Sequence, residues 1–310
     1  MIDAASVWVS GDPASAAVFE LARRVAQTAT TALIVGESGT GKDQIARAIH
    51  QMSPRRDAAL LKIECASLPQ ELVESELFGH ERGAFTGAVE RKRGRLEMAA
   101  GGTIALDEVA ALSTATQSKL LRVLEERSFE RLGGTETLTI DARLLALTNA
   151  DLGRLVTAGR FREDLFFRLS VLTIRVPPLR ERPGDIVPLT DHLLARLAAV
   201  HGKPAAKLTE PVRRMLAGYS WPGNVRELKN ALEHALVFAA ADELEPRDFP
   251  ESVRAADSQL GAGLHSLDEI EKEAIRATLE ATRYKITRSA EILGISRKTL
   301  LDKRKKHGLH

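Results

Sequence analysis

The chain has 310 residues, which is enough for about two domains and a small third, and its hydrophobic content of 44% is that of a globular protein. No apolar run approaches the roughly 18 residues of a membrane span, and the first residues lack a basic stretch followed by an apolar one, so we expect neither a membrane span nor a secretory signal peptide. The net charge of +2 conceals a basic end: residues 283–310 hold nine Lys and Arg against two acidic residues, which indicates a polyanionic partner or a solvated helix face.

Short apolar runs alternate with helical patterns over the first part of the chain. The runs predict strands at 31–36, 59–66, 102–108, 142–150 and 172–179. The segments between them, such as 42–52 and 114–129, repeat apolar residues every three or four positions, as amphipathic helices do. This alternation predicts an α/β domain with a parallel sheet covered on both faces.

The second half of the chain reads differently. Prolines and a glycine at 177–185 break the alternation, and the following residues to about 249 have helical patterns. A polar, small-residue stretch then separates a last helical unit. We therefore predict an α/β domain at 1–182, a helical domain at 183–250, a linker at 251–265 and a small all-α domain at 266–310.

The single cysteine, Cys65, lies in the second predicted strand. One cysteine allows no internal disulfide and is typical of a reducing cytosol, so we expect a cytoplasmic protein. No pattern of His or Asn residues indicates a nucleophile, and we interpret Cys65 as a thiol of the core.

A glycine-rich loop follows the first strand and opens a helix. Loops of this kind present backbone N–H groups to phosphate oxygens, while their lysine reaches the terminal phosphates. Asp43 stands where a Ser or Thr usually touches Mg²⁺, which weakens the match. The predicted phosphate-binding residues are Gly36, Glu37, Ser38, Gly39, Thr40, Gly41, Lys42 and Asp43.

Acidic and basic residues downstream suit nucleotide hydrolysis. Asp107 and Glu108 end the third strand, as expected for a holder of Mg²⁺ followed by a carboxylate that orients the attacking water. Asn149 ends the fourth strand, where a polar side chain can sense the terminal phosphate. Arg162 and Arg168 could stabilise transition-state charge, in trans from a neighbouring subunit, although two arginines alone are more often a surface feature.

Residues 286–308 predict two helices around a tight turn. Ala290 is small where the helices approach, Gly294 allows the turn, and Ile295 and Leu300 pack the pair. The second helix of such a motif enters the major groove of DNA. The predicted DNA-binding residues are Ser296, Arg297, Lys298, Thr299, Lys303 and Arg304.

The preceding helix offers Leu267, Ile270, Ala274 and Ile275 as one face. That face suits either dimerisation or packing within the unit, and the sequence leaves both open.

Together these motifs resemble the central AAA+ domain of bacterial sigma-54-dependent transcription activators, followed by the Fis-type helix-turn-helix of that family. The resemblance covers nearly the whole chain and is carried by "GESGTGKD", "ESELFGHERGAFTGA", "GGTIALDE", "LLRVLEERSFERLGG", "FREDLFFRLSVLTIRVPPLRERPGDI" and "WPGNVRELKN". It implies an AAA+ P-loop core at 1–182, an α-helical lid at 183–250 and an ATPase that uses Mg²⁺.

The resemblance also implies residue roles. Lys42 would bind phosphate, Asp107 would hold Mg²⁺ through water, and Glu108 would activate the hydrolytic water. Asn149 and Arg226 would be the first and second sensors, and Arg162 and Arg168 the arginines that act in trans. The hexapeptide at 83–88 has no titratable side chain, and the family implies that it is a loop that contacts the sigma factor, made of Gly83, Ala84, Phe85, Thr86, Gly87 and Ala88.

The implied partners are the sigma-54 RNA polymerase holoenzyme, enhancer DNA and further copies of the chain in a homo-hexamer, with an inactive dimer as an option. Many relatives begin with a receiver or ligand-sensing domain, which this sequence lacks. We therefore expect a regulatory protein in trans, or a sequence that is part of a longer chain.

Two residues depart from the family. Arg304 replaces a residue that is often apolar, and Glu64 replaces an asparagine that restrains the catalytic glutamate in relatives. Glu64 would either approach Glu108, where two carboxylates disfavour each other, or turn to solvent or to a nearby arginine. Two other functions are possible. An unfoldase or helicase loader is opposed by the 83–88 motif, and a DNA-binding repressor with a decayed ATPase is opposed by the intact Lys42.

Overall fold

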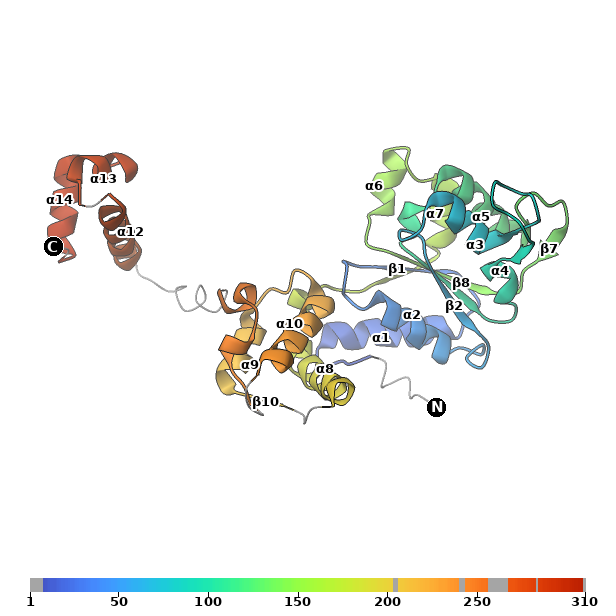
Figure 1. Ribbon diagram of the computed structural model, residues 1–310, viewed down its shortest axis with the longest axis horizontal. Coiled ribbons are helices and arrows are strands. Elements are labelled where there is room, and N and C mark those ends of the chain that lie inside the picture. Colours follow the sequence, from blue (N-terminus) through green and yellow to red (C-terminus); the bar gives the residue numbers. More distant parts are fainter. Residues whose placement is uncertain (1–7, 203–205, 240–242, 256–266, 283, 309–310) are drawn as a thin grey trace. The chain divides into compact units, whose positions relative to one another are not determined.

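The computed structural model describes residues 8–202, 206–239, 243–255, 267–282 and 284–308. They form two compact units, Met1–Val253 and Arg254–His310, and each unit is described by itself (Figure 1).

The first unit is built on a five-stranded parallel sheet, which confirms the predicted α/β class. Its strands are β1 (Ala32–Val35), β2 (Leu60–Glu64), β5 (Thr103–Asp107), β8 (Arg143–Thr148) and β9 (Leu172–Arg175), in the order β2-β5-β8-β1-β9. All neighbouring strands are parallel, so their carboxyl ends meet at one edge. That edge receives the glycine loop after β1, the acidic pair at the end of β5 and Asn149 after β8, which is the expected place for a ligand in such a sheet.

Helices cover both faces of the sheet, as buried aliphatic strands require. On one face lie α1 (Pro13–Ala26) and α2 (Lys42–Gln51). The other face carries α3 (Gln70–Phe78), α4 (Arg95–Met98), α5 (Thr114–Glu126), α6 (Leu152–Thr157) and α7 (Glu163–Leu169). Alternate residues of the inner strands enter the two cores: in β1, Leu33 faces α3–α7, whereas Ile34 faces α1 and α2. Cys65 is buried in the same core as Leu33, as predicted for a core thiol, and burial raises the pKa of its thiol to about 12.

Shorter elements connect these helices. A turn of 3₁₀ helix, η2 (Val109–Ala111), follows β5. Two antiparallel pairs join β3 (Gly79–His80) to β4 (Lys92–Arg93) and β6 (Ser128–Glu130) to β7 (Thr137–Thr139).

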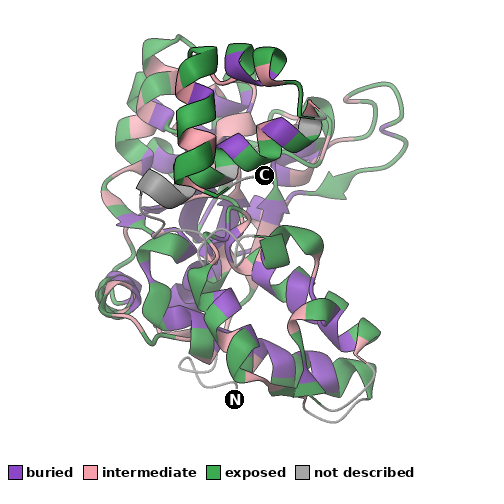
Figure 2. Cartoon of the chain, turned by 90° about the vertical axis from the view of Figure 1, so that its left-hand side faces the viewer, coloured by how far each residue is buried: buried purple, intermediate pink, exposed green. Residues whose placement is uncertain are grey.

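The rest of the first unit is mainly helical, as expected. It contains η3 (Leu179–Glu181), η4 (Pro183–Asp185), α8 (Ile186–His201), α9 (Glu210–Gly218), α10 (Asn224–Phe238) and η5 (Pro246–Asp248). These elements bury a second core around Trp221. Figure 2 shows buried and exposed segments alternating along the helices of the chain.

Two details of this helical part differ from the sequence analysis. A short parallel pair, β10 (Lys207–Leu208) with β11 (Glu243–Leu244), lies among the helices. Residues 251–255, which we assigned to the linker, are helical, and the burial of Val253 in the lid core attaches them to the lid. The remaining linker residues, 256–265, lie outside the described residues.

The second unit has three helices, α12 (Leu267–Ala281), α13 (Ile286–Ile292) and α14 (Arg297–Lys306). Ile275, Leu279, Ala290 and Leu300 form its core, and Gly294 takes a φ of +66° in the turn. The predicted helix-turn-helix is therefore confirmed. Ile275 packs within the unit and Ala274 is exposed, while the side chains of Leu267 and Ile270 lie outside the description.

Over the part of the chain that the structure describes, no helix is both long and apolar enough to cross a lipid bilayer.

Candidate functional sites

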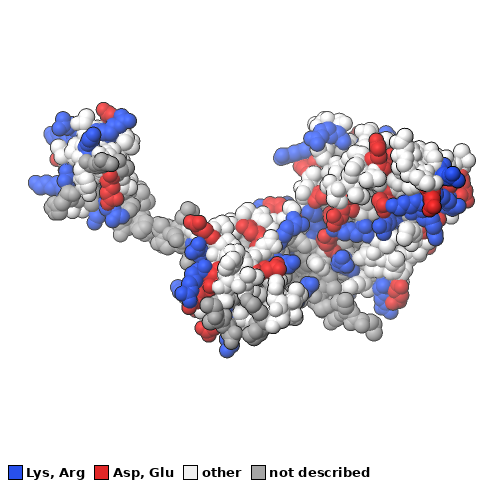
Figure 3. All heavy atoms as spheres, in the orientation of Figure 1, with Lys and Arg blue, Asp and Glu red and all other residues white. Residues whose placement is uncertain are grey.

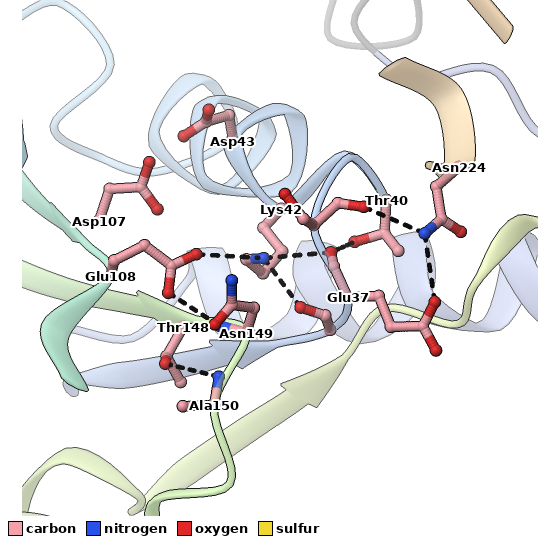
Figure 4. Close-up of polar contacts among 12 residues, drawn as sticks. Glu37, Thr40, Lys42, Asp43, Asp107, Glu108, Thr148, Asn149, Ala150 and Asn224 are labelled. Atoms are coloured by element: carbon pink, nitrogen blue, oxygen red, sulfur yellow. Dashed lines mark hydrogen bonds and ion pairs between the residues drawn. The ribbon is translucent and has the colours of Figure 1, made fainter. Parts of the chain in front are cut away.

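The glycine loop between β1 and α2 has a backbone that only glycine adopts easily. Gly39 and Gly41 take φ values of +79° and +101°, in the left-handed region. Lys42 opens α2, and its Nζ donates to the carbonyl oxygens of Gly36 at 2.8 Å and Glu37 at 3.2 Å (Figure 4). Burial lowers the pKa of Lys42 against the opposing pull of nearby carboxylates. The loop and its lysine thus form the anion-binding end of a helix.

Glu108 lies directly beside this lysine. Its Oε1 is 3.8 Å from Lys42 Nζ, and its Oε2 accepts a hydrogen bond of 3.0 Å from the backbone N–H of Asn149. The backbone of Glu108 takes a φ of +53°, which is uncommon for a residue other than glycine. The structure therefore brings the predicted general base, the P-loop lysine and the predicted first sensor together.

A second group of charges surrounds Asp43 and Asp107. The Nζ of Lys62 lies 2.8 Å from Asp43, 2.8 Å from Asp107 and 3.2 Å from Glu64. Burial acts to lower the pKa of Lys62, but its hydrogen bonds to Asp107 and Asp43 outweigh burial and raise that pKa above its ordinary value. The sequence analysis missed Lys62, although its position two residues before Glu64 places both side chains on the α2 face of β2.

Glu64 does not take the position that one of our two alternatives gave it. Its side chain is 59% exposed and pairs with Lys62, while Glu108 contacts Lys42 and the backbone N–H of Asn149. The other alternative, pairing with a neighbouring cation, is the arrangement present, with a lysine in place of the arginine that we expected.

The acidic residues at this edge suit Mg²⁺ held jointly with phosphate. Among the described residues, no group of three or more His, Cys, Asp or Glu could hold a metal ion alone. Mg²⁺ is commonly bound by one or two carboxylates together with substrate phosphates and waters. Asp43 and Asp107, both contacting one ammonium group, supply that donor set next to the phosphate loop.

The lid and the segment leading into it contact the phosphate loop through several side chains. Arg180 donates to both carboxylate oxygens of Glu37, at 2.8 and 2.6 Å. Asn224 donates to Glu37 at 3.2 Å and to the carbonyl of Ser38 at 3.0 Å. Arg180 and then Asn224 lower the pKa of Glu37 to about 2. Sequence reasoning missed both residues, although they stand in the "PPLRER" and "WPGN" segments.

Arg226, the predicted second sensor, donates to Ser38 Oγ at 2.7 Å. A cavity of about 530 Å³ lies between the phosphate loop and the lid. It is lined by residues of both parts, including Gly39, Lys42, Asp107, Glu108, Leu193, Leu197 and Arg226. A cavity with an anion-binding loop on one wall and aliphatic side chains on the other fits a nucleotide.

The two other arginines lie away from this cavity. Arg162 pairs with Asp164 at 2.7 Å and donates to Ser118 Oγ at 3.1 Å. Arg168 lines a different hollow, with Thr31 and Arg127. As far as the chain is described, neither arginine lines the cavity beside its own phosphate loop.

Residues 83–88 form a closed loop that β3 and β4 carry between α3 and α4. Gly83 and Gly87 have φ values of +82° and +107°, and the N–H of Gly83 donates to the carbonyl of Ala88 at 2.8 Å. The ring of Phe85 meets that of His80 edge-on at 5.0 Å and stays 38% exposed; Thr86 is also exposed. At the loop base, Arg131 pairs with Glu81 at 2.9 Å. The loop thus presents an apolar and a hydroxyl group on an anchored base.

The structure divides the predicted DNA-binding residues into two groups. Ser296 caps α14 by accepting from the N–H of Thr299 at 3.0 Å, and Arg297 and Lys298 in the first turn are exposed. Lys303 instead pairs with Glu271 of α12, and Arg304 lies over the ring of Tyr284 at 6.0 Å.

The outward face of α14 also carries residues that we did not name. With about 100° per residue, the exposed Leu301, Asp302 and Lys305 share the sector of Arg297 and Lys298. Figure 3 shows Lys and Arg gathered on the C-terminal unit.

The parallel sheet, the glycine loop at its edge and the helical lid define a P-loop ATPase of the AAA+ class. Three family matches agree with this: residues 8–175 match the Sigma-54 interaction domain, residues 180–264 the AAA+ ATPase lid domain, and residues 266–307 the bacterial regulatory protein, Fis family. The chain belongs to the sigma-54 interaction domain family, to which its Fis-type DNA-binding domain is joined.

Individual relatives agree with this assignment. VnfA of Azotobacter vinelandii, a nitrogen fixation protein, is 46% identical over 288 residues, which cover 91% of this chain and 55% of VnfA. The transcriptional regulatory protein ZraR of Klebsiella oxytoca is 46% identical over 299 residues, covering 95% of this chain and 68% of ZraR. The chain therefore spans about half the length of the first of these relatives.

A solved structure supports the fold. NtrX of Brucella abortus, crystallised in complex with ADP, has a TM-score of 0.75 and 33% sequence identity, and the match covers 97% of this chain and 70% of that one.

We predict that Lys42→Ala and Glu108→Gln separate binding from turnover. Lys42→Ala removes a charge-assisted contact and should weaken nucleotide binding by roughly tenfold or more. Glu108→Gln keeps an oxygen that can accept from Asn149, so binding should persist while kcat falls by about 10²- to 10⁴-fold. Equilibrium binding of a fluorescent ATP analogue and steady-state hydrolysis measure the two effects. Parental turnover in Glu108→Gln would remove Glu108 from the role of general base.

A further prediction concerns DNA. Lys298→Ala and Lys305→Ala should each weaken duplex binding and reduce the slope of log affinity against log salt by about one, because each removes one phosphate contact. Lys303→Ala is the matched control, since Glu271 already holds that lysine. Fluorescence anisotropy at several salt concentrations gives the slopes. A larger loss of slope in Lys303→Ala than in the other two would place the DNA on a different face.

Proposed function

We propose that this chain is an ATP-hydrolysing transcription activator that binds enhancer DNA and remodels the closed complex of sigma-54 RNA polymerase. One observation carries the proposal: a core with a P-loop, an acidic strand end and a lid also bears an anchored loop, 83–88, that has no group for catalysis. A loop of this composition fits contact with another protein, and the family match supports the sigma factor as that protein.

The residues at the sheet edge divide the work of hydrolysis. Lys42 exchanges its contacts with the loop carbonyls for the terminal phosphates of ATP, and the P-loop N–H groups bind the remaining phosphate oxygens. Glu108, held by the N–H of Asn149, accepts a proton from the attacking water. Asp43 and Asp107 would hold Mg²⁺, which when bound neutralises charge on the phosphates. Arg226 of the lid contacts Ser38 of the phosphate loop, so binding of phosphate to this loop would act on the lid through Arg226.

We further propose that hydrolysis requires a ring of subunits, a hexamer in view of the family. Arg162 and Arg168 lie outside the nucleotide cavity of their own chain, and the exposed Phe167 and Val171 flank Arg168 as an apolar contact surface would. In the assembly these arginines would stabilise the transition state in the neighbouring site. Such an activator acts in the cytoplasm.

Mixing two inactive variants tests the assignment in trans. Arg168→Ala keeps an intact phosphate loop, and Lys42→Ala keeps an intact arginine. We expect ATPase activity to reappear in the mixture, because each variant supplies what its neighbour lacks. Specific activity of the parent should also rise with protein concentration. An arginine that acts on its own chain would leave the mixture as inactive as its components.

The contact with the sigma factor is tested at the loop tip. Thr86→Ala should leave ATP hydrolysis intact and abolish both binding of the sigma factor and open-complex formation, because Thr86 is exposed and does not line the nucleotide cavity. Thr157→Ala, another exposed threonine, is the control and should change neither activity. A Thr86→Ala variant that lost hydrolysis but still bound the sigma factor would refute this role of the loop.

A further inference from the structure

Lys62 occupies a chemically unusual position for a strand residue of the ATPase core. Its ammonium group has three N–H donors, and three carboxylates lie within 3.2 Å of it: those of Asp43, Asp107 and Glu64. Asp43 comes from the first turn of α2, and Asp107 ends β5. Lys62 therefore joins α2, the helix after the phosphate loop, to strand β5 through ion pairs.

Two of these carboxylates are the ones that suit Mg²⁺. Asp43 follows the P-loop lysine, and Asp107 ends the strand beside the loop. Without a cation between them, two carboxylates at this distance from a common point repel each other. Lys62 supplies that cation. Lys62 Nζ contacts one oxygen of each aspartate, and a metal ion that bound the same two oxygens would take its place.

The third carboxylate differs from the other two. Glu64 is 59% exposed, whereas Asp107 is 19% exposed, and Glu64 lies on the same strand face as Lys62, two residues along. Glu64 can therefore keep its contact with the lysine after the lysine has left the sheet edge. Glu64 is also one of the residues that depart from the family pattern.

We propose that Lys62 is a resident counter-cation of the Asp43–Asp107 pair, that it gives way when the site takes up Mg²⁺, and that Glu64 retains the displaced ammonium group. Lys62 and Glu64 thus set the concentration of Mg²⁺ at which the site accepts its nucleotide. This inference rests on the proposed use of Mg²⁺ at Asp43 and Asp107.

The test measures the Mg²⁺ concentration that gives half-maximal binding of a fluorescent ATP analogue, in a Glu108→Gln background that stops hydrolysis. Lys62→Met should lower this concentration by roughly fivefold, because it removes the competitor. Glu64→Gln should raise it, because the lysine then binds Asp43 and Asp107 alone. Lys119→Met, which also removes a partly exposed lysine from an ion pair, with Glu74, is the control and should change nothing.

The double variant separates this mechanism from a general effect of charge. If Lys62 carries the influence of Glu64, then Glu64→Gln has no further effect once Lys62 is methionine. Independent electrostatic effects would instead add. Additive effects, or an unchanged half-saturating concentration in Lys62→Met, overturn the proposal.

A second readout needs no nucleotide. In EDTA, Lys62→Met should unfold at a lower temperature than the parent, because Asp43 and Asp107 then lose the ammonium group that both contact, and Mg²⁺ alone should restore its midpoint more than it raises that of the parent. Lys62→Gln gives the same measurement if the methionine variant folds poorly. A parent whose nucleotide binding is independent of Mg²⁺ would contradict both this inference and the proposed metal site, whereas a Mg²⁺-dependent parent with an indifferent Lys62→Met contradicts the inference alone.

Discussion

The contact between Glu37 and the lid determines the geometry of the nucleotide site. Arg180 and Asn224 both donate to this carboxylate, and Asn224 in turn accepts from the backbone N–H of Leu179 at 2.7 Å. The lid backbone comes so close to the loop that a Cβ on Gly39 would lie 2.4 Å from the carbonyl oxygen of Gly223. Glycine at this position is therefore needed for lid contact as well as for the left-handed φ of the loop. A change in the phosphate loop can therefore reach the lid through these direct contacts.

The loop at 83–88 is attached to the same site from its other side. The segment that contains α3, the loop and α4 begins after β2 and ends at β5. Strand β2 carries Lys62 and Glu64, and β5 ends in Asp107. A rearrangement of the charges among these residues acts on both strands from which the loop segment extends. We infer that this connection, together with the anchored base at Arg131, lets an exposed loop without titratable groups respond to nucleotide chemistry elsewhere in the core.

The sequence predicted the features that depend on local pattern and missed those that depend on packing. Periodicity located the five strands and the helix-turn-helix, and the order of motifs located Lys42, Asp107 and Glu108 at one sheet edge. Lys62 was missed because its partners come from α2 and β5, which only the register of the folded sheet brings together. The pairing of Lys303 with Glu271 was not predicted, because it depends on how α12 packs against α14. The predicted linker starts too early in the sequence, because the burial of Val253 depends on its packing in the lid core.

The central claim is that the phosphate loop and the lid form one nucleotide site. Amide hydrogen exchange in the Glu108→Gln protein, with and without Mg²⁺ and ATP, tests it most directly, because exchange reports local opening residue by residue. The account predicts that exchange slows together in residues 36–43 and in residues 221–228 of the lid. Protection confined to residues 36–43, with exchange in the lid segment unchanged, would contradict it.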